Sequence, residues 1–250
     1  MRDEEFFVGY LPVPGRLSQF LIAISVGLIT AFAALAWAAG ATQDDPGDGR
    51  FRGDFGRQTV KGVLELKPYP LLRVTEGSER IPEGHTLMLS AGGKRGLMGR
   101  AASLGGQIVQ VSGVMLKRGE LDMLQVRGGK NGLQAAEGEG AATPAEPLGK
   151  WRLAGEICDG KCLAGAMRPG RRMAHKACAN LCLIGGVPPV FLSTQPVEGA
   201  ETMLIAGPDG GEMPKALYDH VAAFVSIEGE LERRGDLLIF KVDPSSVKEL

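Results

Sequence analysis

The sequence has no excess of charge of either sign, since 28 Lys and Arg residues face 29 Asp and Glu residues and the formal net charge is −1. Aromatic residues make up only 6% of the chain. Proteins that bind single-stranded nucleic acid need a basic groove and aromatic side chains on which bases stack. We therefore expect no nucleic-acid partner. Hydrophobic residues at 44% over 250 positions are enough to bury a core, which excludes global disorder.

Common catalytic motifs are also missing. The chain contains no G-x-S-x-G and no H-E-x-x-H, and the Gly-rich stretch 92–96 lacks the spacing of a P-loop. A c-type haem is not expected, because C-x-x-C-H does not occur. Since no general acid–base pair is visible, the sequence does not favour an autonomous enzyme.

One long apolar run lies near the N-terminus, with no charged residue over 17–43. About 20 such residues cross the hydrocarbon core of a bilayer as a helix. A cleaved signal peptide is the alternative, because 36–38 resembles a small-x-small cleavage site. The run is longer than a usual signal-peptide core, however, and the preceding leader is acidic instead of basic. We predict a cytoplasmic leader over 1–16 and a transmembrane anchor over 17–41.

The orientation of this anchor does not follow from charge, because arginines lie on both sides of it. A short leader before a long C-terminal body is typical of a signal anchor with its N-terminus inside. We expect a single-pass protein of the inner (cytoplasmic) membrane, with residues 44–250 in the periplasm or outside the cell generally.

Two stretches repeat one pattern at an offset of 116 residues: 109–126 aligns with 225–242. Each alternates apolar and polar residues and turns at Arg-Gly-acidic, as a β-hairpin does. Upstream, Gly62 aligns with Gly155 at an offset of only 93. The sequence thus indicates two copies of one small β-domain, with about 23 extra residues in the second.

Each copy is predicted to contain five short strands with a long, bending fourth strand, which is typical of a small Greek-key barrel of the OB type. The fold class is therefore mainly β, with a transmembrane helix followed by two tandem OB-like barrels, the second with a partly helical Cys/His insertion. The predicted strands lie at 58–66, 69–75, 86–91, 107–117 and 120–127, and at 151–157, 188–194, 202–206, 221–232 and 236–242. The predicted parts are a juxtamembrane linker over 42–57, a first domain over 58–127, a flexible linker over 128–149, a second domain over 150–243 with an insertion over 158–187, and a tail over 244–250.

The insertion contains all four cysteines of the chain. A helix predicted over Met173–Ile184 places His175, Cys178 and Cys182 on one stripe. Cys162 could complete a Cys3His group that binds Zn²⁺ or copper, or the thiols could be redox-active.

Disulfides explain the same cysteines equally well. Four is an even number, and an exported domain meets an oxidising environment. Cys158 is the additional disulfide candidate, and three connectivities are open. Unpaired thiols are the remaining possibility.

Three runs of the second copy follow one another in order: Gly155-Glu-Ile-Cys-Asp-Gly-Lys-Cys162, His175-x-x-Cys178-x-x-x-Cys182 and Gly185-Gly-Val-Pro-Pro. Together they resemble a largely uncharacterised family of small exported bacterial OB-like domains, which carry a D-x-K-C segment, H-x2-C-x3-C, a Gly-rich turn and a closing hairpin. The resemblance covers about residues 151–243. Most members of this family have no assigned activity. The resemblance implies that the characteristic residues of this chain are Cys162, His175, Cys178 and Cys182. The chain departs from the pattern at Cys158 and at Gly160, where Ser is usual, and the added cysteine makes full disulfide pairing possible.

The insertion is also basic, with a local net charge of +4 over 158–182. A docking surface for an acidic partner protein or for anionic headgroups is one interpretation, and a solvated loop surface is the other. The candidate patch residues are Lys161, Arg168, Arg171, Arg172 and Lys176.

Three functional hypotheses follow. The first is a membrane-anchored periplasmic accessory or assembly subunit of an envelope or respiratory complex, which docks to a protein partner through its OB-like domains. The second is a metal-binding or thiol-redox domain that uses a Cys3His cluster. The third is a disulfide-stapled structural envelope protein.

Overall fold

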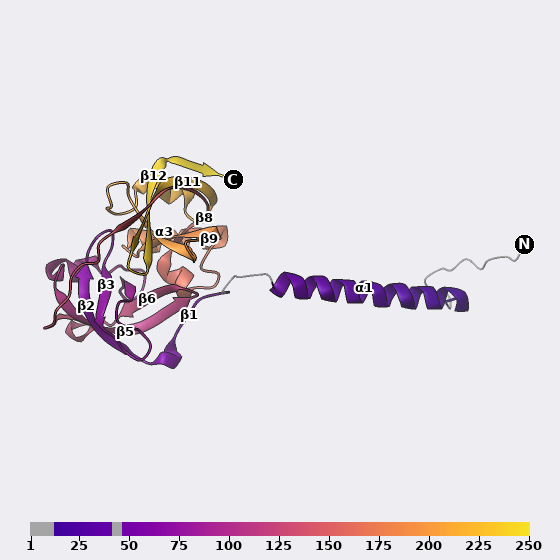
Figure 1. Cartoon of the computed structure of the whole chain (residues 1–250), viewed down its shortest axis with the longest axis horizontal. Helices are drawn as coiled ribbons and strands as arrows, with labels where there is room; N and C mark the ends of the chain where they lie inside the picture. Colours follow the sequence, from indigo (N-terminus) through magenta and orange to yellow (C-terminus); the bar gives the residue numbers. More distant parts are fainter. Residues whose placement is uncertain (1–12, 42–46) are drawn as a thin grey trace, which may run out of the picture. The chain divides into compact units, whose positions relative to one another are not determined.

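The computed structural model describes residues 13–41 and 47–250. The chain divides into two compact units, an N-terminal unit that ends at Asp45 and a body over Pro46–Leu250 (Figure 1). The described part of the first unit is the helix α1 (Gly15–Ala41). Most of the predicted leader, and residues 42–46 of the predicted linker, lie outside the described residues.

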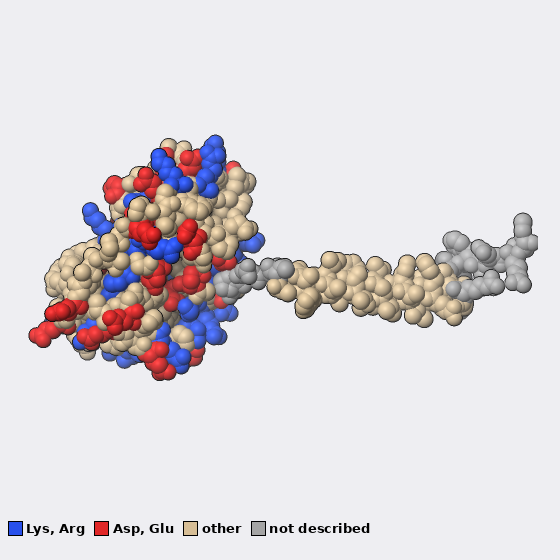
Figure 2. Space-filling view, viewed as in Figure 1, with Lys and Arg blue, Asp and Glu red and all other residues tan. Residues whose placement is uncertain are grey.

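Helix α1 is apolar on all sides. Its segment Leu17–Ala41 has a mean hydropathy of 2.3 and is not buried against the rest of the chain. Large side chains such as Ile29 and Trp37 expose 69% and 76% of their surface, and Figure 2 shows no Lys, Arg, Asp or Glu on the part of the helix drawn in tan. Such a helix is typical of a membrane environment or a protein core. By length and composition, α1 can cross a membrane, as the sequence predicts.

The body is mainly β, and both copies contribute strands close to the predicted positions. The first half contains β1 (Arg50–Phe51), β2 (Gln58–Glu65), β3 (Leu71–Glu76), β4 (Thr86–Ser90), α2 (Met98–Ala101), β5 (Ile108–Arg118), β6 (Leu121–Val126) and β7 (Leu133–Ala135). The second half contains β8 (Glu146–Asp159), α3 (Lys176–Ile184), β9 (Pro189–Val197), β10 (Ala200–Ala206), β11 (Phe224–Arg234) and β12 (Leu237–Glu249).

The five strands of the second half form a closed barrel in the order β10-β12-β11-β8-β9. The first half forms one sheet in the order β1-β5-β2-β3-β4-β6, in which β5 also pairs with β6 and with β7. Each pairing of the barrel has a counterpart in this sheet, including the parallel pairs β10–β12 and β4–β6. The two halves therefore share one pairing scheme.

The strand registers repeat as well. Gly113 on β5 pairs with Val126 on β6, and Gly229 on β11 pairs with Val242 on β12, which are the positions 116 residues later. A Cβ atom on either glycine would lie 2.3–2.4 Å from a carbonyl oxygen of the neighbouring strand. The same crowded crossing thus requires glycine in both halves.

Three segments predicted as linkers or a tail contain strands, so these boundaries are corrected. Strand β1 lies within 42–57, β7 and the start of β8 lie within 128–149, and β12 continues through most of 244–250. They pair with the long strands β5 and β11. Backbone pairing of this kind needs no alternation of apolar side chains, and for that reason the composition of these segments did not reveal it.

Within residues 47–250, the buried apolar side chains form three clusters. One lies inside each half, and the third joins the halves. This shared core packs Leu71, Leu116 and Met123 of the first half with Val190 and Ile239 of the second. The two copies are therefore parts of one packed body.

The hairpin tips of the two halves make reciprocal contacts. The Glu120 carboxylate accepts hydrogen bonds from the backbone N–H of Thr202 at 3.1 Å and from its hydroxyl at 3.1 Å. The Asp236 carboxylate accepts one from the backbone N–H of Thr86 at 2.9 Å. Since Asp236 is the counterpart of Glu120 and Thr202 that of Thr86, each half caps the same strand of the other.

His85 adds a charged contact to this interface. Its Nδ1 pairs with Asp236, and its Nε2 lies 3.2 Å from Asp122 Oδ2. Burial of the imidazole opposes protonation, but the hydrogen bonds to the two carboxylates outweigh it and raise the pKa of His85 to about 9. We therefore expect a positively charged His85 between the halves at neutral pH.

The reciprocal caps predict the effect of removing either charge. Glu120→Gln and Asp236→Asn should each lower the free energy of unfolding of the body by about 1–2 kcal/mol, because a charge-assisted hydrogen bond to a strand end is weakened. Chemical denaturation of the full chain in detergent micelles measures this. The exposed Glu137→Gln is the control, and equal stability of all three variants would show that the caps are unimportant.

His85 predicts a pH dependence. Its pKa is about 9 in the folded protein against 6.5 for an unperturbed histidine, so its stabilising contribution is complete below pH 6.5 and is lost as the pH rises through about 9. Between these pH values, the wild type should lose up to about 3 kcal/mol more unfolding free energy than His85→Gln. Denaturation curves at a series of pH values test this, and parallel profiles for the two proteins would contradict it.

Candidate functional site

The insertion begins where β8 ends. A π-helical turn covers Cys162–Ala166, and a 3-10 turn over Met173–His175 leads into α3, which ends at Ile184 with Gly185 as its C-cap. The helix predicted over Met173–Ile184 is thus confirmed as a 3-10 turn followed by an α-helix. In the first half, Leu64 on β2 and Leu71 on β3 lie seven residues apart in the chain. The equivalent positions of the second half, Ile157 on β8 and Val190 on β9, lie 33 residues apart. The extra residues fall between the first two strands, as predicted.

Three cysteines of the insertion lie together. Sulfur atoms of Cys162, Cys178 and Cys182 are all within 4.8 Å of one another, and the Cys162 and Cys182 sulfurs are 3.9 Å apart. Cys162 and Cys182 expose only 3% and 1% of their surface, whereas Cys178 is half-buried. We call Cys162, Cys178 and Cys182 the thiol group.

The predicted Cys3His group needs a correction, because His175 belongs to a second set of donors that shares only Cys162 with the thiol group. Donor atoms of Asp159, Cys162 and His175 lie within 4.8 Å of one another. The buried Asp159 carboxylate lies 3.1 Å from His175 Nε2 and accepts a hydrogen bond from the backbone N–H of Cys162 at 2.8 Å. Sequence reasoning did not select Asp159, although it belongs to the D-x-K-C segment. The Asp159–His175 pair fixes the backbone that carries Cys162.

The first half supplies a cation to the site. The Lys94 ammonium donates a hydrogen bond to the Cys178 sulfur. The turn that carries Lys94 packs closely on the end of α3, where Gly96 donates its N–H to the Gly185 carbonyl at 2.7 Å. A Cβ atom on Gly185 would lie 1.9 Å from the Lys94 carbonyl oxygen. The sequence shows Lys94 only as part of a Gly-rich turn, so its role could not be predicted.

The thiols differ in proton affinity. A hydrogen bond donated by the Cys162 thiol lowers the pKa of Cys182, and the Lys94 charge acts in the same direction. The same hydrogen bond, together with burial, raises the pKa of Cys162. Cys182 is therefore the thiol of this pair that ionises first, and Cys162 keeps its proton to stabilise the thiolate.

Cys158 stands apart from the thiol group. It is buried, it interacts with the Glu156 carboxyl, and burial raises its pKa well above the usual value. All four cysteines lie in the described part of the chain, and each is a free thiol. The two structural disulfides that the sequence allowed are thus not present in the structure.

The predicted basic patch needs a correction at Lys161. This residue exposes only 3% of its surface, and its ammonium donates hydrogen bonds to the carbonyls of Ala91 at 2.6 Å and Gly93 at 2.7 Å. Lys161 therefore holds the Lys94 turn against the insertion. Among the other candidates, Arg168 and Arg172 are exposed, and Arg171 and Lys176 are partly buried.

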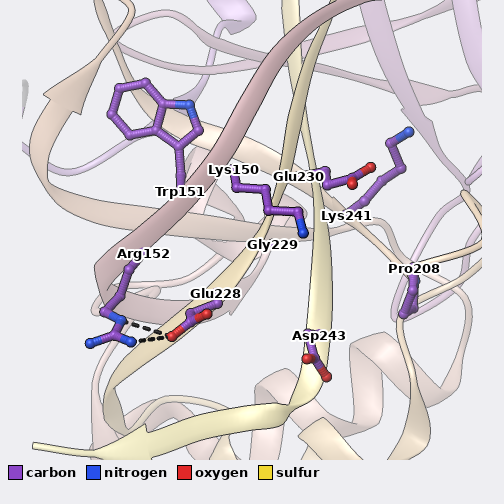
Figure 3. A pocket seen from close by; sticks show the side chains of 9 residues that line it. All are labelled: Lys150, Trp151, Arg152, Pro208, Glu228, Gly229, Glu230, Lys241 and Asp243. Atoms are coloured by element: carbon purple, nitrogen blue, oxygen red, sulfur yellow. Dashed lines mark hydrogen bonds and ion pairs between the residues drawn. The ribbon is translucent and has the colours of Figure 1, made fainter.

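A groove on the outer face of the barrel is a competing site. It has a volume of about 610 Å³ and carries three basic and three acidic side chains besides Trp151, Pro208 and Gly229 (Figure 3). Arg152 bonds to Glu228, Glu230 lies opposite Lys150 and Lys241 in the strand register, and the Lys241 ammonium lies 2.7 Å from Glu232 Oε2. The groove therefore carries equal numbers of basic and acidic side chains, which gives no indication of a ligand of one sign.

Comparisons with protein-family models, with curated proteins and with solved structures give no match for this chain. Its family resemblance stays a prediction, and its function must be argued from the site.

The position of Lys161 yields a prediction. Lys161→Met keeps the apolar stem but leaves the carbonyls of Ala91 and Gly93 without their donor, and it should lower the free energy of unfolding by about 2–3 kcal/mol. Lys150→Met, at an exposed position, should change it by less than about 0.5 kcal/mol. Denaturation of both variants provides the test, and similar losses would show that Lys161 has no special role in the interface.

Proposed function

We propose that this protein binds a soft metal ion through Cys162, Cys178 and Cys182. The observation that carries the proposal is the approach of three thiols to within 4.8 Å in the absence of any disulfide among them. Thiolates select Zn²⁺ and Cu⁺ over harder ions. With Zn–S bonds of about 2.3 Å, tetrahedral ligation places sulfurs about 3.8 Å apart. The 3.9 Å between the Cys162 and Cys182 sulfurs is close to this spacing.

Charge balance supports the same ion. Three thiolates and Zn²⁺ carry a net charge of −1, which the Lys94 ammonium beside Cys178 would neutralise. A compensated charge matters here because two of the ligands are almost fully buried. The buried Asp159–His175 pair would act outside the first ligand set, where it orients Cys162.

The coordination is incomplete, which favours a transport or delivery role. Among the described residues, no fourth His, Cys, Asp or Glu joins all three thiols within 4.8 Å. Structural zinc sites usually close four protein ligands around the ion, whereas sites that react or exchange keep one position open. The half-buried Cys178 gives that open position access to solvent or to a partner.

The rest of the chain suits an accessory protein of the cell envelope. We propose that α1 anchors the body to the inner membrane with the body in the periplasm, that both halves are OB-like, and that a partner complex receives the ion. The apolar surface of α1 and the common strand pairing of the two halves support these proposals. In this role the protein is an assembly subunit that supplies metal, which unites two of the hypotheses drawn from the sequence.

The test is metal analysis of the full chain, purified in detergent micelles under reducing conditions and titrated with Zn²⁺ or Cu⁺. We expect about one equivalent to bind, with affinity falling at acid pH because the thiols must lose protons. Cys182→Ser and Cys178→Ser should weaken binding at least about tenfold.

Cys158→Ser is the matched control, because it removes a buried cysteine of the same segment that lies outside the thiol group. Binding that is lost equally in Cys158→Ser, or that is absent from the wild type, would overturn the proposal.

A further inference from the structure

We infer that the thiol group also exchanges with organic disulfides, with Cys178 as the entry thiol and a Cys162–Cys182 disulfide as the product. The inference deepens the proposed function, because this reaction consumes two of the three metal ligands. The site would then hold its ion in the reduced state and release it on oxidation.

Accessibility assigns the entry step to Cys178. It is the half-buried member of the thiol group, whereas Cys162 and Cys182 expose 3% and 1% of their surface. Thiol–disulfide exchange proceeds through a mixed disulfide and requires that the attacking sulfur reach its target. An incoming disulfide therefore meets Cys178 first.

The helix geometry makes a Cys178–Cys182 disulfide unfavourable as the final product. Both lie on α3, four residues apart. Cβ atoms at this spacing are about 5–6 Å apart, whereas a disulfide needs about 3.5–4.5 Å. A disulfide between these two residues would distort the helix, and another thiol could therefore attack and replace it.

Cys162 and Cys182 are placed to form the stable product. They lie on separate segments, the π-helical turn and α3, with their sulfurs 3.9 Å apart. Rotation of the side chains can bring the sulfurs to bonding distance without bending one helix. Their bond would also close the loop between the two segments, which restricts the unfolded chain.

The reaction balances as three exchanges. The Cys178 thiolate attacks RSSR, forms a bond to one sulfur and expels RS⁻. The Cys182 thiolate then attacks the Cys178 sulfur and expels the second RS⁻. Finally, the Cys162 thiol gives its proton to solvent, and its sulfur attacks Cys182 and frees the Cys178 thiolate. The sulfurs of Cys162 and Cys182 lose one electron each, the organic disulfide gains both electrons, and the two RS⁻ ions take up the proton released by Cys162 and one from water.

Oxidation leaves Cys178 as the one remaining thiolate of the group. A single thiolate cannot retain an ion that three held, so Zn²⁺ would leave the site. The substrate class is therefore a disulfide, either of a small molecule or of a partner protein. An oxidising envelope provides such compounds, and the reverse reaction with a dithiol would restore the site.

The experiment uses the full chain in detergent micelles, reduced, loaded with Zn²⁺ and treated with glutathione disulfide. Peptide mapping by mass spectrometry locates the disulfide, and a chromogenic chelator follows released Zn²⁺. We expect a Cys162–Cys182 disulfide, free thiols at Cys158 and Cys178, and release of Zn²⁺ at the rate of disulfide formation.

Two variants separate the entry step from general reactivity. Cys178→Ser should slow formation of the disulfide at least about tenfold, because the accessible attacking thiol is lost. Cys158→Ser should leave the rate unchanged. An unchanged rate in Cys178→Ser, or a mixed disulfide on Cys178 without any Cys162–Cys182 product, would overturn the inference.

The outcomes also distinguish this inference from the proposed function. Disulfide formation in a reduced protein that binds no Zn²⁺ would support the exchange route and overturn the metal role. Tight binding of Zn²⁺ that glutathione disulfide does not disturb, with all four thiols intact, would support the metal role and overturn the exchange.

Discussion

The packing of the two halves against each other is the constraint on which the rest of the body depends. Glu120 caps the start of β10 and Asp236 caps the start of β4, so each half stabilises an equivalent strand of the other. Contacts of this reciprocal kind are those of a two-fold symmetric dimer. Here they occur within one chain, whose halves share strand pairing and register. The apolar cluster between the halves gives this arrangement its hydrophobic stabilisation.

The insertion is present in only one of the two otherwise equivalent halves, and it carries the cysteines of the candidate site. One copy gained a segment with four cysteines, but the segment does not form the site by itself. Lys161 anchors it to carbonyls of the first half, and the turn held there places Lys94 beside Cys178. The close approach of glycines 96, 185 and 186 allows the turn to pack so near the end of α3. Both halves are therefore needed to set the charge around the thiols.

The same geometry is compatible with both chemistries proposed for the thiol group. Burial and a nearby cation favour a compact, charge-compensated metal site. The half-exposed position of Cys178 gives reactants access to that site. Asp159 accepts a hydrogen bond from the Cys162 backbone and contacts His175, so the two side chains hold Cys162 in place. Under the two proposals made above, metal binding and disulfide exchange would be alternative states of this thiol group, selected by the redox conditions around the protein.

The sequence by itself determined the features that depend on local pattern. An uncharged apolar run predicted α1, period-two alternation predicted the main strands, and comparison of the chain with itself revealed the duplication and the insertion. Only the tertiary structure decided the pairing of β1, β7 and the end of β12, the burial of Lys161, and the grouping of His175 with Asp159. Lys94 and Cys178 lie 84 residues apart in the chain. No local pattern records such a contact, because it exists only after two separately patterned halves have packed together.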